Sequence, residues 1–191
     1  ALPPERLWPT IFGKTDAKGG WIVDDEAERI WREKTGNVNP IIRLGEKENF
    51  WGPAGETGAC GPCSEIKFFM GADEQLAEYQ ALARSGDPQA MERLVHDIVE
   101  LGDLFLEIWN LVFPQYDQQL NGSRPPLKNR GIDTGLGLER TTTAVQFIQS
   151  GGKIQTPYET DLLVPMVQAV AAVAGLPYPT LAGGAEAEKI I

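Results

Sequence analysis

A chain of 191 residues with 42% hydrophobic residues and five Trp can bury one sizeable core, which predicts one globular domain and argues against disorder. Its 17 Lys and Arg against 27 Asp and Glu give a formal net charge of -10, the wrong sign for a module that binds mainly by neutralising phosphates, so any nucleic-acid contact must be local. The two cysteines lie too close together for the disulfide framework of a secreted protein, and the longest apolar stretch, 162–176, is too short to span a membrane; we therefore expect a cytoplasmic location and no membrane partner.

The first predicted elements are a helix over residues 24–34 and a strand over residues 64–70. The helix has acidic residues in its first turn and apolar residues at helical spacing, and a Thr-Gly pair ends it. In the strand, apolar residues alternate with Glu65 and Lys67, which predicts that only one of its faces is buried.

Residues 73–103 form an acidic excursion, with eight acidic residues and two arginines. An "SGDP" break divides it into two predicted helices, residues 73–84 and 88–101. The second helix has one apolar stripe, which favours a solvated surface element docked by one face over a partner-binding site.

Residues 104–113, "LFLEIWNLVF", are apolar on both faces of a predicted strand, as in the middle of a covered sheet. Alternation places Glu107 on one face and Asn110 on the other, each among apolar neighbours. Buried polar groups cost roughly 1 to 3 kcal/mol each unless they have partners. A structural hydrogen-bond network and a ligand site both remain open for these two residues.

The remaining elements follow a turn signal, "NGSRPP", after which the chain is expected to return in a strand that ends near Asp133. Two more helices are predicted over residues 136–150 and 160–174, each stopped by glycine.

Cys60 and Cys63 form a Cys-x-x-Cys motif that invites a zinc or redox interpretation. Structural zinc needs four ligands, and the sequence has no second cysteine pair and only one histidine. A thioredoxin-like pair would open a helix, whereas this pair follows a Gly-rich loop and precedes a strand. We therefore expect no metal site, and assign the small residues around the cysteines to close backbone packing.

The segment "GIDTGLGLER", residues 131–140, predicts a strand end at Asp133, a tight turn at Gly135 and Gly137, and a helix that carries Arg140 in its first turns. A generic Gly-rich turn and a nucleotide site are both compatible with it. Neither the phosphate-loop pattern nor the dinucleotide fingerprint is present.

Four motifs together resemble the alanyl-tRNA synthetases, a family of class II aminoacyl-tRNA synthetases, and they occur in that family's order. They are "NFWGPAGETGACGPCSEI" (49–66), "EIWNLVF" (107–113), "GIDTGLGLER" (131–140) and "YETDLL" (158–163). The resemblance covers nearly the whole chain and implies an α+β fold, an antiparallel sheet flanked by helices. It also implies that residues 1–191 are a later part of the catalytic domain, because the family's motifs 1 and 2 precede the position of Ala1.

The resemblance also implies roles for individual residues in an alanine site. Trp51 would wall the pocket, Val112 would contact the methyl group and Asn110 would hydrogen-bond the substrate. Asp133 would accept from the ammonium group, with Gly135 leaving room beside it.

The resemblance implies that ATP is bound by Arg140, which would be the catalytic motif 3 arginine, and by Gly137. Mg²⁺ would accompany the nucleotide. The implied reaction is attack of the alanine carboxylate on the α-phosphate of ATP, and the complete enzyme then transfers alanine to tRNA(Ala). The 191-residue chain is expected to be weakly active at most, because in the family motif 2 supplies the arginine that binds the α-phosphate. A catalytically silent paralogue or an interaction module is the alternative. The chain departs from the family at residues 53–55, at Ala59 and in the length of its acidic stretch, which puts the loop conformation in doubt.

Overall fold

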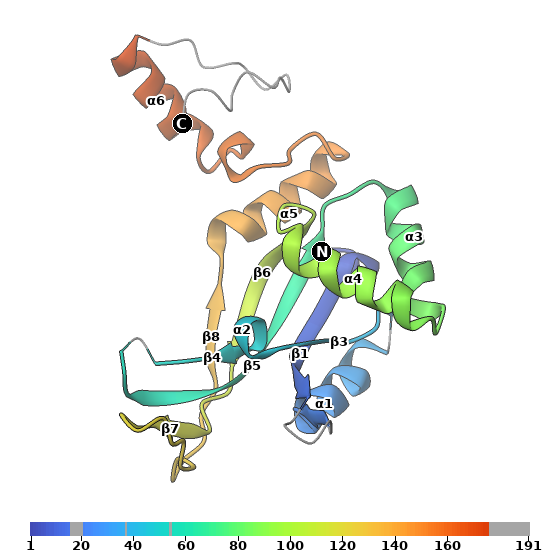
Figure 1. The fold of residues 1–191 in the computed structure, drawn as a ribbon. Coiled ribbons are helices and arrows are strands. Elements are labelled where there is room, and N and C mark those ends of the chain that lie inside the picture. The colour runs from blue at the N-terminus through green and yellow to red at the C-terminus, as the bar shows by residue number, and fades with distance from the viewer. Residues whose placement is uncertain (16–20, 37, 54, 176–191) are drawn as a thin grey trace. The chain divides into compact units, whose positions relative to one another are not determined.

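The structure is a computed structural model that describes residues 1–15, 21–36, 38–53 and 55–175. These residues form two compact units, residues 2–137 and a second unit that begins at Leu138. The first unit contains a sheet with helices, and the second is helical (Figure 1). The strands are β1 (Leu7–Thr15), β2 (Trp21–Val23), β3 (Ile42–Leu44), β4 (Phe50–Trp51), β5 (Gly58–Phe69), β6 (Phe105–Val112), β7 (Tyr116–Gln118) and β8 (Asp133–Leu136).

The helices of the first unit are η1 (Pro4–Arg6), α1 (Asp25–Thr35), α2 (Glu46–Asn49), α3 (Asp73–Arg84) and α4 (Pro88–Glu100). The second unit holds α5 (Leu138–Ser150), η2 (Pro157–Glu159) and α6 (Val164–Ala174). The acidic excursion therefore consists of two helices, as predicted. Within the described residues, no helix is long and apolar enough to cross a membrane.

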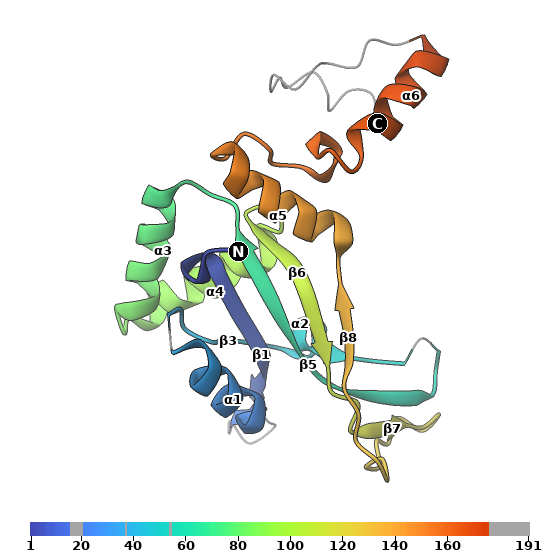
Figure 2. The ribbon, with the colours of Figure 1, turned by 180° about the vertical axis from the view of Figure 1, so that it is seen from behind.

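The sheet has the strand order β2-β1-β5-β6-β8, with β3 beside β1 and with β4 and β7 beside β5. Its pairs are antiparallel except for the parallel pair β1–β3. Figure 2 shows β1, β5, β6 and β8 in this order across the sheet. The predicted antiparallel sheet with flanking helices is therefore confirmed.

The core of the first unit lies between α3, α4 and one end of the sheet. Trp8, Phe69 and Phe105 come from β1, β5 and β6, and their rings form edge-to-face contacts with centroids 5.2 to 5.8 Å apart. Leu94 and Ile98, on the apolar stripe of α4, are fully buried against them. The acidic excursion is thus docked by one face and completes the core.

Helix α1 begins as the sequence predicts, because the Oδ1 atom of Asp24 accepts a hydrogen bond from the backbone N–H of Ala27 at 3.0 Å. It ends at Gly36, whose φ of 62° is left-handed. Trp31 Nε1 donates to Ser64 Oγ at 2.7 Å, and this bond connects the helix to β5.

Two sequence predictions for the strands are wrong. Strand β5 extends over Gly58–Phe69, and from Cys60 onward it is buried or half-buried on both faces, because the side chains of Glu65 and Lys67 are also largely covered. Strand β8 begins at Asp133 instead of ending there, and Gly135 lies inside it without a turn. The helix predicted over residues 160–174 begins later, at Val164.

Candidate functional site

The register of the neighbouring strands β6 and β8 brings four of the predicted alanine-site residues to one face of the sheet. Val112 of β6 lies opposite Asp133 of β8, and Asn110 lies opposite Gly135. Directly opposed residues of antiparallel strands point to the same side. On the other side of β6, Asn110 lies opposite Glu65 of β5, so this face continues into the centre of the sheet.

Trp51, the fifth predicted alanine-site residue, belongs to the two-residue strand β4 and pairs with Gly61 of β5. Gly61 is two residues before Cys63, which lies opposite Val112. Because alternate residues of a strand share a face, Trp51 is on the same face as Val112. Trp51 is 42% exposed.

The two predicted ATP residues belong to different units. The backbone N–H of Gly137 donates to Ile108 O at 3.1 Å and prolongs the pairing of β8 with β6. Arg140 is the third residue of α5, as the sequence predicts, and therefore belongs to the second unit.

A β-bulge in β6 overturns the prediction that Glu107 and Asn110 lie on opposite faces. Ile66 pairs with Trp109, but Lys67 pairs with Glu107, so one residue of β6 is extra. Glu107 is thereby on the face of Lys67 and Asn110. Alternation alone could not reveal this, because a bulge interrupts the two-residue period.

The polar groups on this face differ in how well they are satisfied. Glu65 forms an ion pair with Lys67 at 3.1 Å, with both side chains largely buried. The Oδ1 atom of Asn110 is buried and has no hydrogen-bond partner among the described protein atoms. Buried polar atoms are nearly always paired, so an orphaned acceptor indicates that a ligand or a water donates to it.

The Cys-x-x-Cys motif is part of strand β5, and both of its thiols are free and buried. Burial, reinforced by the negative charge of Glu65, raises the pKa of Cys63 to about 12, so its thiol is protonated at neutral pH. Within the described residues, no group of three or more His, Cys, Asp and Glu side chains could hold a metal ion. That the chain binds no zinc stays a prediction.

A close backbone approach explains the small residues around the motif. A Cβ added at Gly61 would lie 2.1 Å from Phe113 O, so only glycine fits there without a shift of the backbone. Two of the sequence departures from the family lie near this motif. Residues 53–55 include Ala54, which lies outside the described residues, and Ala59 of β5 pairs with Asp117 of β7.

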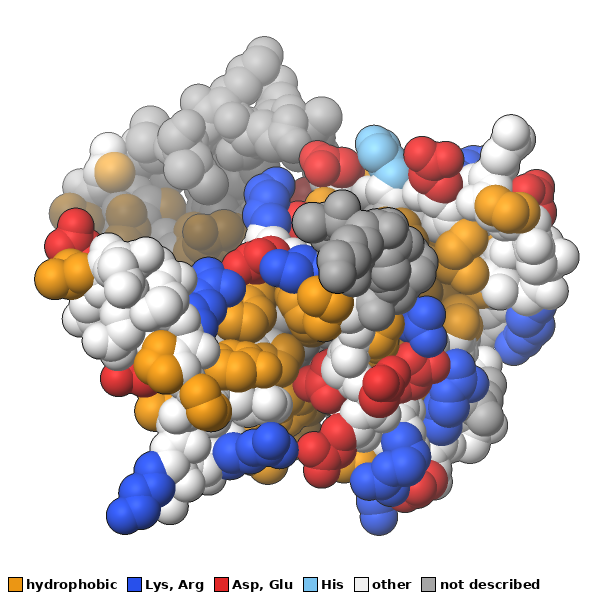
Figure 3. Space-filling model, turned by 60° about the horizontal axis from the view of Figure 1, so that its bottom comes forward, with side chains coloured by type: hydrophobic (Ala, Val, Ile, Leu, Met, Phe, Trp, Pro, Cys, Tyr) orange, Lys and Arg blue, Asp and Glu red, His pale blue; other side chains and the backbone are white. Residues whose placement is uncertain are grey.

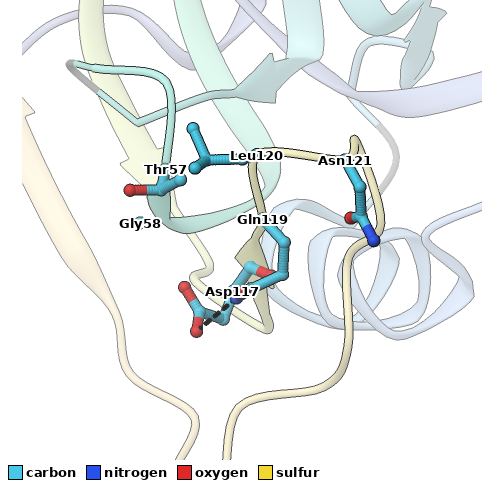
Figure 4. A pocket seen from close by; sticks show the side chains of 6 residues that line it. All are labelled: Thr57, Gly58, Asp117, Gln119, Leu120 and Asn121. Carbon is cyan, nitrogen blue, oxygen red and sulfur yellow. Dashed lines mark hydrogen bonds between the residues drawn. The ribbon is translucent and has the colours of Figure 1, made fainter.

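Two cavities are lined by residues other than the predicted site residues. One, of about 460 Å³, is bordered by the start of β5 and by β7 with the turn after it; Figure 4 shows its six lining residues, with Gln119 donating to Asp117 at 2.8 Å. The other, of about 410 Å³, includes Lys14 and Arg124. Hydrogen bonds from these two side chains lower the pKa of Glu46, and the bond from Lys14 has the larger effect. Neither cavity includes a predicted site residue.

The charged side chains on the face shown in Figure 3 are of both signs and interspersed, with hydrophobic side chains between them.

The sequence analysis missed two buried polar residues next to this face, Asn49 and Thr10, and it assigned Glu107 to the opposite face of its strand. Asn49 is fully buried at the end of α2 and donates to Thr10 Oγ1 at 3.0 Å. A polar residue directly before the Phe-Trp pair was a usable signal for Asn49. Thr10 is in a mostly apolar strand and is also fully buried.

Comparison with known proteins gives the class of this fold and site. The family "tRNA synthetases class II (A)" matches residues 1–191, and the chain belongs to this family. Its relatives include the alanine–tRNA ligase of Rubrobacter xylanophilus, which is 41% identical over 191 residues, all of this chain and 19% of the relative. The alanine–tRNA ligases of Acidithiobacillus ferridurans and Solibacter usitatus are 39% and 40% identical over 93% and 92% of the chain, and 17% of each relative. The chain thus spans about a fifth of the length of the relatives it matches.

Proposed function

We propose that the chain forms the amino-acid-binding part of an alanine–tRNA ligase that activates alanine with ATP. The observation that carries this proposal is the buried, unpartnered Oδ1 of Asn110 on the face shared with Val112 and Asp133. An amino acid is a suitable ligand, because its ammonium group supplies three donors and a positive charge.

In the proposed complex, the ammonium group donates to the Asp133 carboxylate and to Asn110 Oδ1. Charge-assisted hydrogen bonds of this kind are about twice as strong as neutral ones. Val112, which is buried, contacts the methyl group, and Trp51 covers it. Gly135 leaves space, since an added Cβ there would meet no atom within 4 Å.

ATP binding is assigned to Arg140 and Gly137. A planar guanidinium can stack on adenine and also bind a phosphate, which suits the arginine for this role. Magnesium prefers carboxylate and phosphate oxygens and neutralises phosphate charge when it is bound with ATP. Glu107 is the carboxylate we propose for it, because the bulge brings this residue to the site face.

The proposed reaction needs positioning and charge neutralisation rather than a protein nucleophile. The alanine carboxylate attacks the α-phosphate, a bond forms between its oxygen and phosphorus, and pyrophosphate leaves. Transfer of alanine to tRNA(Ala) belongs to the complete ligase. A cytoplasmic location remains a prediction from the cysteine content.

Alanine-dependent exchange between ATP and pyrophosphate tests this proposal. We expect exchange that depends on alanine in the complete natural protein that carries this chain. Absence of exchange and of alanine binding in the complete protein would favour a silent paralogue or an interaction module.

A further inference from the structure

Asn49 connects the short helix α2 to the two central strands of the sheet. The helix has four residues, and Asn49 is its buried residue, with 0% exposure. A helix this short is not stable alone, so its position depends on tertiary contacts. Asn49 Nδ2 donates to Thr10 Oγ1 of β1 at 3.0 Å and to Cys63 O of β5 at 3.1 Å.

Cys63 makes a second contact with the same helix. Its thiol donates to Glu48 O at a sulfur–oxygen distance of 3.8 Å. In the neighbouring strand β6, Val112 lies directly opposite Cys63, two residues after Asn110. The end of α2 is thereby joined to the part of the sheet that carries two proposed alanine-site residues.

Trp51, in contrast, is held by few contacts of its own strand. Strand β4 consists of Phe50 and Trp51, and it pairs with β5 through Pro62 and Gly61. Because the strand is this short, the residue that directly precedes it, Asn49, contributes to its position together with the packing of Phe50 against Phe12.

We infer that Asn49 is a positioning residue for alanine binding: its bonds to Thr10 and Cys63 fix strand β4 and hold Trp51 beside Val112. This inference rests on the proposed function, which assigns Trp51 to the alanine pocket. The Oδ1 atom of Asn49 is buried without a hydrogen-bond partner in the described structure, and such an atom costs stability. A role in holding β4 in place explains why an amide with one unsatisfied end occupies this position.

Two substitutions separate positioning from stability in the complete protein. Asn49→Asp keeps the shape but removes the donors, and Asn49→Leu removes both polar atoms. We expect each to raise the KM for alanine about tenfold while the KM for ATP stays within about twofold, because one hydrogen-bonded contact is affected at the amino-acid site. Asn39→Leu is the matched control: Asn39 is also buried, and its Nδ2 donates to Glu5 O at 2.7 Å and Leu7 O at 2.9 Å, both near the other end of β1. This control should lower Tm without changing either KM.

A double-mutant cycle with Trp51→Ala tests whether Asn49 acts through Trp51. If it does, Asn49→Leu should add little to the alanine KM of Trp51→Ala. An equal rise in both backgrounds overturns the inference, as does a loss of kcat with an unchanged alanine KM. If Trp51→Ala itself leaves the alanine KM unchanged, then the proposed alanine pocket is wrong as well.

A measurement that does not depend on catalysis covers the case in which the proposed function fails. Amide hydrogen exchange of the peptide that contains Phe50 and Trp51 should be at least about tenfold faster in Asn49→Leu than in the parent, and unchanged in Asn39→Leu. Equal exchange in Asn49→Leu and the parent would overturn the structural step of the inference whether or not the protein activates alanine.

Discussion

Replacing Asn110 with Ala tests whether the buried amide on β6 serves a ligand or a structural network. Its Oδ1 atom has no donor in the described structure, so the substitution deletes no hydrogen bond to that atom. It removes an acceptor whose unsatisfied burial costs about 1 to 3 kcal/mol, and this gain offsets the packing that is lost. We therefore expect the free energy of unfolding to change by less than about 1 kcal/mol in a urea titration.

Alanine binding should respond much more strongly to the same substitution. A hydrogen bond to a charged group contributes about 1.5 to 3 kcal/mol, which corresponds to a rise in the alanine KM of roughly 10- to 150-fold. Pyrophosphate exchange over a range of alanine concentrations measures it. Asn39→Ala is the control, because that buried amide donates to two carbonyls and accepts from Gln80, so its loss should reduce stability and leave the KM unchanged. If Asn110→Ala left the alanine KM unchanged and lowered the free energy of unfolding by about 3 kcal/mol, this residue would belong to a structural network.

Four further outcomes can be measured. Asp133→Ala should raise the KM for alanine far more than the KM for ATP, and an unchanged alanine KM would remove Asp133 from the pocket. Gly61→Ala would place a Cβ 2.1 Å from a carbonyl oxygen, so it should lower the free energy of unfolding by about 3 kcal/mol or more in thermal unfolding. Gly135→Ala meets no atom within 4 Å, so it should leave stability unchanged and weaken alanine binding. Similar losses of stability in the two variants would contradict this contrast. Replacing Cys60 and Cys63 by Ser should leave the metal content unchanged, and stoichiometric zinc lost in the double variant would disprove the absence of a metal site. Because burial raises the pKa of Cys63 to about 12, the native state keeps a proton that the unfolded state loses, so the free energy of unfolding should fall between pH 9 and 12. This fall should be smaller in Cys63→Ser, and Tyr79, whose pKa burial also raises to about 12, should account for a remaining part of it.

The sequence predicted the elements whose signals are local. Two helix ends were predicted from nearby residues, the start of α1 from its acidic first turn after Asp24 and the end of α5 from the glycines that follow it, and the structure agrees. The buried face of α4 was likewise predicted from its apolar stripe. Features that depend on strand pairing were not predicted. The β6 bulge arises from the register with β5 and moves Glu107 to another face, and no pattern within β6 alone indicates it.

The candidate site shows the same division. Asn110 was singled out because a polar residue interrupts an apolar strand, and the structure places it opposite Gly135. Glu65 and Lys67 were expected to face solvent because they alternate with apolar residues, yet both side chains are largely buried and form an ion pair. Alternation separates the two faces of a strand, but it does not tell which polar face is covered by other elements.

The position of β8 in the sheet has a consequence for how substrate and structure depend on each other. Within the described residues, β8 has four residues and pairs with β6 alone, while β5 and β6 each have partners on both sides. Short strands with one neighbour open more readily than central ones. The proposed ammonium acceptor, Asp133, is thus on the part of the pocket that is least well ordered by the sheet. A ligand that binds only when β8 is paired with β6 stabilises that pairing by mass action. Bound amino acid should therefore stabilise the edge strand that carries its own binding residue, Asp133.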